Sequence, residues 1–192
     1  MPGDRSLTET EKKVRARLDG APLHHEQMAV VSNIYRAAAA VRQHMENSVL
    51  READLTWTAF VVLWVLWIWG ELESRYVAEE VGISKGTLTG VARTLEGRAL
   101  VRRSGHPTDR RRVLLALSGG GEELMQRLFP AFNAEEAFVT SELSGEECHD
   151  TADALRRIVA FVEAHGGDRR SRLLDGADPR PRRSGRRRAR GG

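Results

Sequence analysis

The sequence predicts a mainly helical fold that carries one small β-hairpin. Apolar residues recur at helical spacing along most of the 192 residues, and 41% of the chain is hydrophobic, which suffices for the core of one domain. One stretch departs from that spacing: HPTDRRRVLLALS, residues 106–118, leads from turn residues into a short apolar run typical of a strand. Three consecutive arginines, Arg110, Arg111 and Arg112, stand directly before this run, and their position needs an explanation.

The first part of the chain predicts three helices. Residues 7–18 favour a short helix, and residues 24–49 favour a long one because they lack glycine and proline and space their valines helically. Residues 56–69 predict a helix that is apolar nearly all round and is therefore expected to be buried. This helix is shorter than the about 20 residues that span a bilayer, so we expect no membrane segment.

Two shorter helices joined by a tight turn are predicted next. Residues 74–81 form the first, and Gly82 ends it, because a left-handed position after a helix favours glycine. Ser84 caps the second helix. The second helix places one apolar stripe inward: Leu88, Val91, Ala92 and Leu95. Its other faces carry polar and basic side chains: Lys85, Thr87, Thr89 and Arg93.

A two-stranded hairpin follows these helices. Residues 101–104 and 112–117 predict its strands, and the loop between them contains the proline and the Thr-Asp pair that turns favour. A further helix is expected from Ser118 to about residue 142.

The last predicted helix begins at a capping box formed by Ser144 and Glu147. We expect it to end near His165, before two glycines, and to place an apolar stripe inward: Leu155, Ile158, Val159 and Val162. Residues 168–192 are rich in arginine, glycine and proline and are predicted to be disordered.

The net charge of +3 conceals a segregation of charge along the chain. Residues 84–112 hold eight basic and two acidic side chains, and residues 168–192 hold ten arginines and three aspartates. The remainder of the chain is strongly acidic. A basic stripe on an acidic body is the electrostatic pattern expected of a phosphate-binding surface. The basic tail either adds nonspecific affinity for DNA or is a passive solvated end.

The order of helix, turn, helix and hairpin is that of a winged helix-turn-helix. In this arrangement the helix that begins at Ser84 enters the major groove of DNA, and the hairpin loop forms the wing. The arginines then lie at the tip of the wing, where the negative potential of the minor groove or the sugar-phosphate backbone attracts them. The predicted DNA contacts are Lys85, Thr87, Thr89, Arg93, Arg110, Arg111 and Arg112.

At this point the sequence resembles the MarR family, the multiple-antibiotic-resistance-type regulators. The wing of that family reads Asp-x-Arg, three residues, an apolar residue-x-Leu-Thr/Ser, and a glycine three further on. This chain matches with Asp109, Arg111, Leu115, Leu117, Ser118 and Gly121. The segments GISKGTLTGVARTLEGRALVRR and ELSGEE also match, and the resemblance covers about residues 27–165. The chain departs at Ala99, where the family usually has glycine and where alanine tolerates a left-handed backbone poorly.

The resemblance implies a homodimeric, sequence-specific regulator of transcription that reads a near-palindrome in double-stranded DNA. It also implies repression of transcription that a small, often aromatic, ligand relieves. It implies that Arg111 enters the minor groove and that Asp109 orients it through a charge-assisted hydrogen bond. The alternative for this pair is a surface ion pair worth under about 1 kcal/mol. The implied organisation is an extension at 1–22, a regulator domain at 23–167 with its DNA-binding core at about 55–118, and dimerisation helices at about 24–49 and 119–165.

Four residues form a candidate ligand pocket. Trp57 and Trp64 lie two helical turns apart and can face Tyr35 and Arg36 of the preceding helix, with the guanidinium as partner for a carboxylate ligand. The alternative is that the tryptophans belong to the core, where each can bury on the order of 200 Å². No segment brings together the ligands of a metal site, and we expect no cofactor.

Other functions have less support in the sequence. A winged helix can also serve as a protein-interaction module, but residues 84–93 offer few of the apolar anchors that a protein partner requires. No nucleophile, base and orienting group fall together, so we expect no enzyme. The single Cys148 excludes an intramolecular disulfide and is expected to be inert, although it lies in a first helical turn. Together with a polar N-terminus without a signal peptide, it indicates a cytoplasmic protein.

Overall fold

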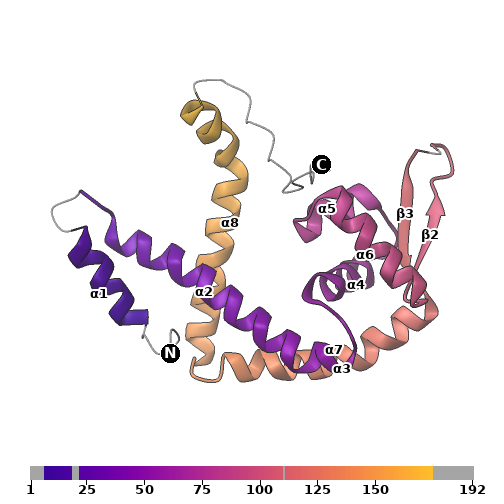
Figure 1. Cartoon of the computed structure of the whole chain (residues 1–192), viewed down its shortest axis with the longest axis horizontal. Coiled ribbons are helices and arrows are strands. Elements are labelled where there is room, and N and C mark those ends of the chain that lie inside the picture. Colours follow the sequence, from indigo (N-terminus) through magenta and orange to yellow (C-terminus); the bar gives the residue numbers. More distant parts are fainter. Residues whose placement is uncertain (1–6, 19–21, 110, 175–192) are drawn as a thin grey trace, which may run out of the picture. The chain divides into compact units, whose positions relative to one another are not determined.

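The computed structural model describes residues 7–18, 22–109 and 111–174, in two units that comprise residues 1–139 and 140–192 (Figure 1). In the first unit the elements are α1 (Leu7–Arg17), α2 (His25–Asn47), α3 (Val49–Glu52), α4 (Trp57–Trp69), β1 (Leu72–Glu73), α5 (Ser74–Val81), α6 (Lys85–Gly97), β2 (Val101–Gly105), β3 (Val113–Leu117) and α7 (Gly119–Val139). The second unit contains α8 (Gly145–Leu173). The predicted fold class, mainly helical with a small hairpin, is confirmed.

Helix α4 forms the centre of the first unit. Its buried residues are Phe60, Val62, Leu63, Val65 and Leu66. They pack with buried residues of α2, α5, α6, β3 and α7 in one hydrophobic cluster. Burial of such side chains contributes about 1.5–3 kcal/mol each, so this cluster stabilises the base on which the surface elements rest.

The expectation that α4 is buried on all sides is wrong at its C-terminal half. Trp64, Ile68 and Trp69 are exposed, with 38%, 50% and 64% of their surface accessible. The composition of α4 is nearly uniform in hydrophobicity, so it contains no polar face that would indicate which side meets solvent. In the described part of the chain, no helix combines the length and the apolar character needed to cross a membrane.

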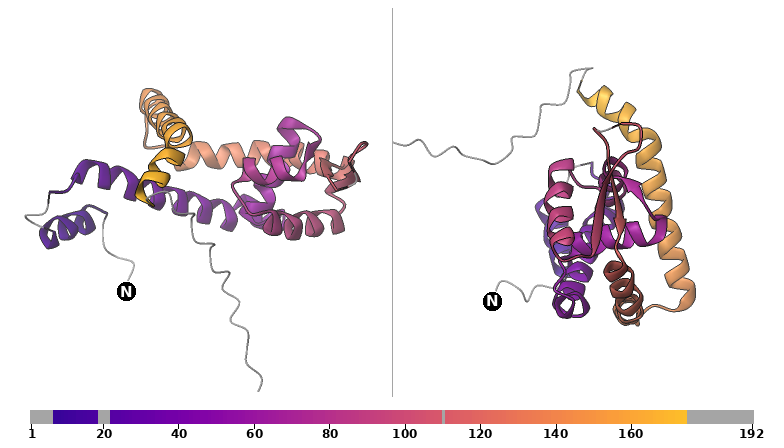
Figure 2. Two further views of the ribbon diagram at one scale, coloured as in Figure 1. Left: turned by 90° about the horizontal axis from the view of Figure 1, so that it is seen from above. Right: turned by 90° about the vertical axis from the view of Figure 1, so that its right-hand side faces the viewer.

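The hairpin belongs to a sheet of three strands rather than two. Strand β3 lies between β1 and β2, and both pairings are antiparallel. Leu72 pairs with Leu115 and Glu73 with Leu114, so the segment before α5 is joined to the middle of the hairpin and its loop-side half. Two residues are too few to show alternation, which explains why the sequence did not indicate β1. Figures 1 and 2 show the hairpin at one end of this unit, beside α5 and α6.

The turn between α5 and α6 has the predicted chemistry. Gly82 follows α5 with φ of 70°, in the left-handed region, and its N–H donates to the carbonyls of Ala78 and Glu79. The hydroxyl of Ser84 then accepts from the N–H of Thr87, which satisfies a free donor in the first turn of α6. Because both helix ends are capped, the turn holds α6 in a defined direction relative to α5.

Ala99 has a left-handed backbone in the turn between α6 and β2, with φ of 54°. This is the position where the related pattern has glycine. Helix α6 ends at Gly97, and Ala99 still adopts the left-handed conformation that is strained for an L-residue with a Cβ. The Ser118 hydroxyl donates to the carbonyl of Ala99, and the N–H of Ser118 donates to the carbonyl of Leu100. A Cβ at Gly121 would lie 2.1 Å from that same Leu100 carbonyl oxygen, so only glycine fits where α7 begins.

Helix α8 is longer than the sequence predicted. The capping box is confirmed, since Ser144 accepts from the N–H of Glu147 and the Glu147 carboxylate accepts from the N–H of Ser144. The predicted end near His165 is wrong, because the helix continues through two glycines to Leu173. A glycine costs about 1 kcal/mol relative to alanine inside a helix, and this cost alone does not end it.

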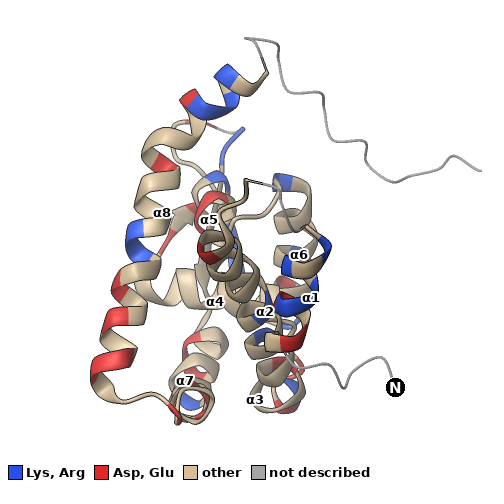
Figure 3. Ribbon diagram, turned by 90° about the vertical axis from the view of Figure 1, so that its left-hand side faces the viewer, with Lys and Arg blue, Asp and Glu red and all other residues tan. Residues whose placement is uncertain are grey.

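The apolar stripe of α8 is not covered by any described element of its own unit. Leu155, Ile158, Val159 and Val162 are exposed, and α8 contains no buried residue. Acidic residues lie in its first turn and basic residues in its last turn, as the helix dipole favours (Figure 3). Because α8 extends to Leu173, the predicted disorder of residues 168–192 is wrong for residues 168–173, which are helical. Residues 175–192 lie outside the described part of the chain.

Candidate nucleic-acid interface

The face of α6 predicted to meet DNA is exposed. Leu88, Ala92 and Leu95 are buried as predicted and anchor the opposite side of the helix. The predicted contact residues Lys85, Thr87, Thr89 and Arg93 are all solvent-exposed. The buried stripe thus fixes the rotation of α6 and determines which side chains it presents.

The polar groups of this face differ in how far they are already engaged. The Thr87 hydroxyl lies 2.8 Å from the Ser84 hydroxyl, and the Thr89 hydroxyl donates to the carbonyl of Lys85 at 2.8 Å. Both threonines therefore have a local partner that helps to order the first turns of α6. Lys85 and Arg93 form no side-chain hydrogen bond or ion pair with the described residues, so their charges can act on an external anion.

The wing presents one arginine almost completely to solvent. The Arg111 side chain is 93% exposed. Asp109 accepts from the Arg111 backbone N–H at 3.0 Å and from its Nε at 3.5 Å, as the predicted orienting role requires. The backbone hydrogen bond from Arg111 lowers the pKa of Asp109, so its carboxylate remains charged. Arg110 lies outside the described residues, and its predicted contact with DNA stays a prediction.

Arg112 is more strongly engaged than Arg111. Its Nη1 lies 3.0 Å from Oε1 of Glu73, and its Nε lies 3.2 Å from Oδ2 of Asp109. The hydrogen bond to Glu73 is the main cause that raises the pKa of Arg112. Nearly half of the Arg112 side chain is exposed, so it can still lie close to a phosphate, but its guanidinium is already shared by two carboxylates.

Further arginines of the basic stripe have acidic partners. Arg102 pairs with Glu71 at 3.0 Å, and Arg103 with Glu96 at 3.9 Å. Arg98 donates to the backbone carbonyls of Ala53 and Asp54, which ties the end of α6 to the turn before α4. The carboxylates of Glu71 and Glu73 come from outside residues 84–112, and this is why a charge sum over that window overstates its free positive charge.

One hollow brings α6 and the wing together. It has a volume of about 260 Å³ and is lined by Glu73, Ser74, Arg75, Lys85, Arg111, Arg112 and Val113. Lys85 of α6 and Arg111 and Arg112 of the wing, predicted from separate motifs, thus lie around the same concave surface. An anionic backbone entering here would meet cations from both elements.

Sequence reasoning missed Arg75, which lies in the first turn of α5 on the rim of this hollow. Its guanidinium carbon lies 4.3 Å above the centre of the Tyr76 ring, and its Nε lies 3.0 Å from Oε2 of Glu73. The available signal was its place in the helix that precedes α6, since both helices of a helix-turn-helix approach the duplex.

The structure does not gather the four residues of the predicted ligand pocket around a common cavity. Trp57 packs in an aromatic cluster, with its ring centroid 6.3 Å from that of Phe60 and 6.2 Å from that of Phe132. Tyr35 is 74% exposed, Trp64 is partly exposed, and Arg36 is half-buried. None of the four lines any cavity that we describe, and their role in binding a ligand stays a prediction.

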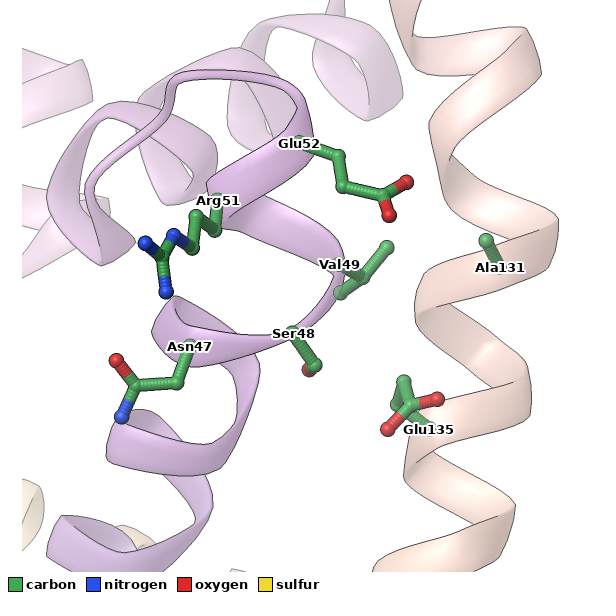
Figure 4. A pocket seen from close by; sticks show the side chains of 7 residues that line it. All are labelled: Asn47, Ser48, Val49, Arg51, Glu52, Ala131 and Glu135. Atoms are coloured by element: carbon green, nitrogen blue, oxygen red, sulfur yellow. The ribbon is translucent and has the colours of Figure 1, made fainter.

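A separate polar cavity lies where the end of α2 and α3 face α7 (Figure 4). It has a volume of about 640 Å³ and is lined by Asn47, Ser48, Val49, Arg51, Glu52, Ala131 and Glu135. Beside it, Nε2 of His44 lies 2.5 Å from Oε2 of Glu135, which joins α2 to α7. No cluster of metal ligands is found among the described residues, and Cys148 is a free, half-buried thiol.

Comparison with known proteins identifies relatives of the same architecture. The family model described as "MarR family" matches residues 55–113. The uncharacterized HTH-type transcriptional regulator YwaE of Bacillus subtilis is 35% identical over 137 residues, which cover 71% of this chain and 80% of YwaE.

Two solved structures are also similar. Sco3205 of Streptomyces coelicolor, a MarR family transcriptional regulator in complex with DNA, superposes with a TM-score of 0.67 at 21% identity over 73% of this chain and 89% of its own. BpsR of Bordetella bronchiseptica, whose DNA binding is regulated by 6-hydroxynicotinic acid, gives a TM-score of 0.60 at 25% identity. The superposition covers 68% of this chain and 98% of the BpsR chain.

Proposed function

The chain belongs to the MarR family of DNA-binding winged helix-turn-helix transcriptional regulators, and from this we propose that it is a homodimeric repressor of a near-palindromic operator. As a member of a family of regulators it is not an enzyme. The observation that supports the proposal is the hollow between α6 and the wing, which both Lys85 and Arg111 line. A regulator of transcription acts where the chromosome is, so we also propose a cytoplasmic location.

In the proposed complex, α6 lies in the major groove and the wing reaches the adjacent minor groove. Arg93 has no partner among the described residues and is suited to bidentate contact with guanine. Thr87 lies near the N-terminus of α6, where amide donors and the helix dipole favour phosphate. Arg111 enters the minor groove, and the Asp109 carboxylate orients it by accepting hydrogen bonds from its backbone N–H and its Nε.

The homodimer is supported by apolar surface on the long helices. The stripe of α8 is exposed along its length, and Val30, Val31 and Tyr35 of α2 are at least half exposed. Contiguous exposed apolar residues on a protein surface mark interaction sites. A two-fold dimer would present two copies of α6 to half-sites about 34 Å apart, which is the reason to expect a near-palindrome.

Relief by a small aromatic acid is the second part of the proposal. Its support is the likeness to BpsR, whose DNA binding is regulated by 6-hydroxynicotinic acid. The predicted residues Tyr35, Arg36, Trp57 and Trp64 stay the candidates for the ligand site. Trp57 and Trp64 would report binding through their fluorescence.

Selection from sheared genomic DNA of the host by the purified full chain, at about 0.15 M salt, tests the proposal. The salt concentration matters because six to ten phosphate contacts lose about 10³–10⁵ in affinity between low and moderate salt. We expect enrichment of a few near-palindromic sites, and we expect aromatic acids to release the protein from them. Uniform recovery across the genome would instead favour a protein-interaction module, whose basic surface binds an acidic partner.

A further inference from the structure

Glu73 occupies the junction between the helix-turn-helix and the wing. It is the last residue of β1 and directly precedes α5, and its backbone pairs with Leu114 of β3. Its side chain is only 13% exposed. One carboxylate is therefore held between the loop side of strand β3 and the helix that positions α6.

The two oxygens of this carboxylate bind two different arginines. Oε2 lies 3.0 Å from Nε of Arg75 in α5, and Oε1 lies 3.0 Å from Nη1 of Arg112, the last residue of the wing loop. Arg112 continues the chain of contacts, since its Nε lies 3.2 Å from Asp109.

The same aspartate accepts from the backbone N–H of Arg111. An ion pair from Arg75 to Glu73, followed by charged hydrogen bonds through Arg112 and Asp109, therefore links the first turn of α5 to Arg111 in the wing loop. The links from Glu73 onward are hydrogen bonds and therefore directional, so a change at Glu73 is expected to alter the position of Arg111.

We propose that Glu73 is a positioning residue for DNA binding, which sets the wing relative to the helix-turn-helix by bridging Arg75 and Arg112. The inference rests on the proposed function, because it assigns to the wing a contact with DNA. Glu73 itself contacts no DNA in this proposal. It restricts where the wing loop carries Arg111, so that this side chain and α6 reach the grooves of one duplex together.

The charge of Glu73 makes the proposal easy to distinguish from a simple electrostatic effect. A carboxylate beside a DNA-binding surface repels phosphate, so its neutralisation alone should tighten binding to any duplex. If Glu73 positions the wing, neutralisation should instead weaken binding to the specific site while leaving nonspecific binding equal or tighter. The two mechanisms thus predict opposite signs on the specific duplex.

The test compares Glu73→Gln with Glu71→Gln in the full chain. Glu71 is a matched control because it lies two residues away and its removal changes the charge equally, but it pairs only with Arg102 among the described residues. Fluorescence anisotropy measures binding to a duplex enriched from genomic DNA by the unmodified protein, and to a scrambled duplex of the same composition. Thermal unfolding of both variants shows whether they remain folded.

Glu73→Gln should weaken specific binding about tenfold, which corresponds to about 1.4 kcal/mol, with no loss on the scrambled duplex. Glu71→Gln should show no specific loss. Equal or tighter binding of Glu73→Gln to the specific duplex would overturn the proposal.

Hydrogen exchange of the free protein provides a second readout that needs no DNA. The wing-loop amides should exchange faster in Glu73→Gln than in Glu71→Gln, and equal exchange would overturn the coupling. If the unmodified protein enriches no sequence, the proposed function fails, while the exchange experiment still decides whether Glu73 holds the wing.

Discussion

At the scale of single residues, Ala99 in the turn between α6 and β2 is held in a conformation that favours glycine. Ala99 stands where the related pattern has glycine, and its backbone is left-handed with φ of 54°. The carbonyls of Ala99 and Leu100 both accept hydrogen bonds from Ser118, and the backbone lies against Gly121. The conformation is thus held by its surroundings despite the strain of a Cβ.

Ala99→Gly should stabilise the protein, because glycine adopts positive φ without the about 1–2 kcal/mol penalty of an L-residue. Part of that gain is offset by the greater freedom of glycine in the unfolded chain. We expect a net gain of about 0.5–1 kcal/mol, seen as an increase of about 1–4 °C in Tm.

The control for this prediction is Ala40→Gly in the exposed interior of α2, which should lower Tm because glycine weakens a helix. A decrease in Tm for Ala99→Gly as well would show that its left-handed backbone carries no strain.

The roles of individual charges were only partly predictable. The spacing of Asp109 and Arg111 is local, so the wing pattern identified both residues, and the structure has the expected contact between them. The partner of Arg112 is Glu73, 39 residues away in the chain. That pairing depends on how β1 aligns with β3, and a two-residue strand leaves no pattern from which to predict the alignment.

At the scale of elements, periodicity located most helices but could not show how their ends are held. Helix α4 begins with a capping residue, Thr56, whose hydroxyl accepts from the N–H of Ala59, and with a second acceptor that comes from another helix. Oε1 of Glu46, in α2, accepts from the N–H of Trp57 at 2.9 Å. That hydrogen bond is the main cause that lowers the pKa of Glu46, and Arg42 lowers it further. One carboxylate thus joins α2 to the start of the central helix.

Glu46→Gln should destabilise the protein by about 1 kcal/mol at pH 7, because it removes a charged acceptor from a helix N-terminus. The folded pKa of Glu46 is lowered, so its contribution is complete above the unfolded pKa and is lost as pH falls through the folded value. The difference in unfolding free energy between the variant and the unmodified chain should therefore shrink below about pH 4.3.

Denaturant unfolding at several pH values measures this difference. Glu52→Gln is the matched control, since that carboxylate has no hydrogen-bond partner among the described residues and its loss should matter little at any pH. A Glu46→Gln effect of constant size from pH 7 to pH 3 would contradict the assignment.

At the scale of the whole molecule, exposed apolar surface remains after each unit has formed. The predicted inward stripe of α8 was identified correctly as a stripe, but no other described element of its own unit covers it. A pattern of apolar residues shows that a face requires a partner and does not say whether the partner is the same chain or another copy. This ambiguity explains why the sequence predicted the helix and its stripe but not its burial.

Val159→Glu should separate a dimer into monomers, since it places a charge in the middle of the α8 stripe, where a dimer interface would desolvate it. Analytical ultracentrifugation should show the unmodified chain at twice its mass of 21.4 kDa and the variant at that mass. Ala164→Glu is the control, because Ala164 lies on the opposite side of α8 and its substitution should leave the dimer intact.

Binding to a two-half-site duplex should weaken by about 10²–10⁴ for Val159→Glu, because two linked recognition helices act at a high effective concentration. A Val159→Glu protein that stays dimeric would show that α8 does not form the interface through this stripe, and the apolar residues of α2 would then be the surface to substitute next.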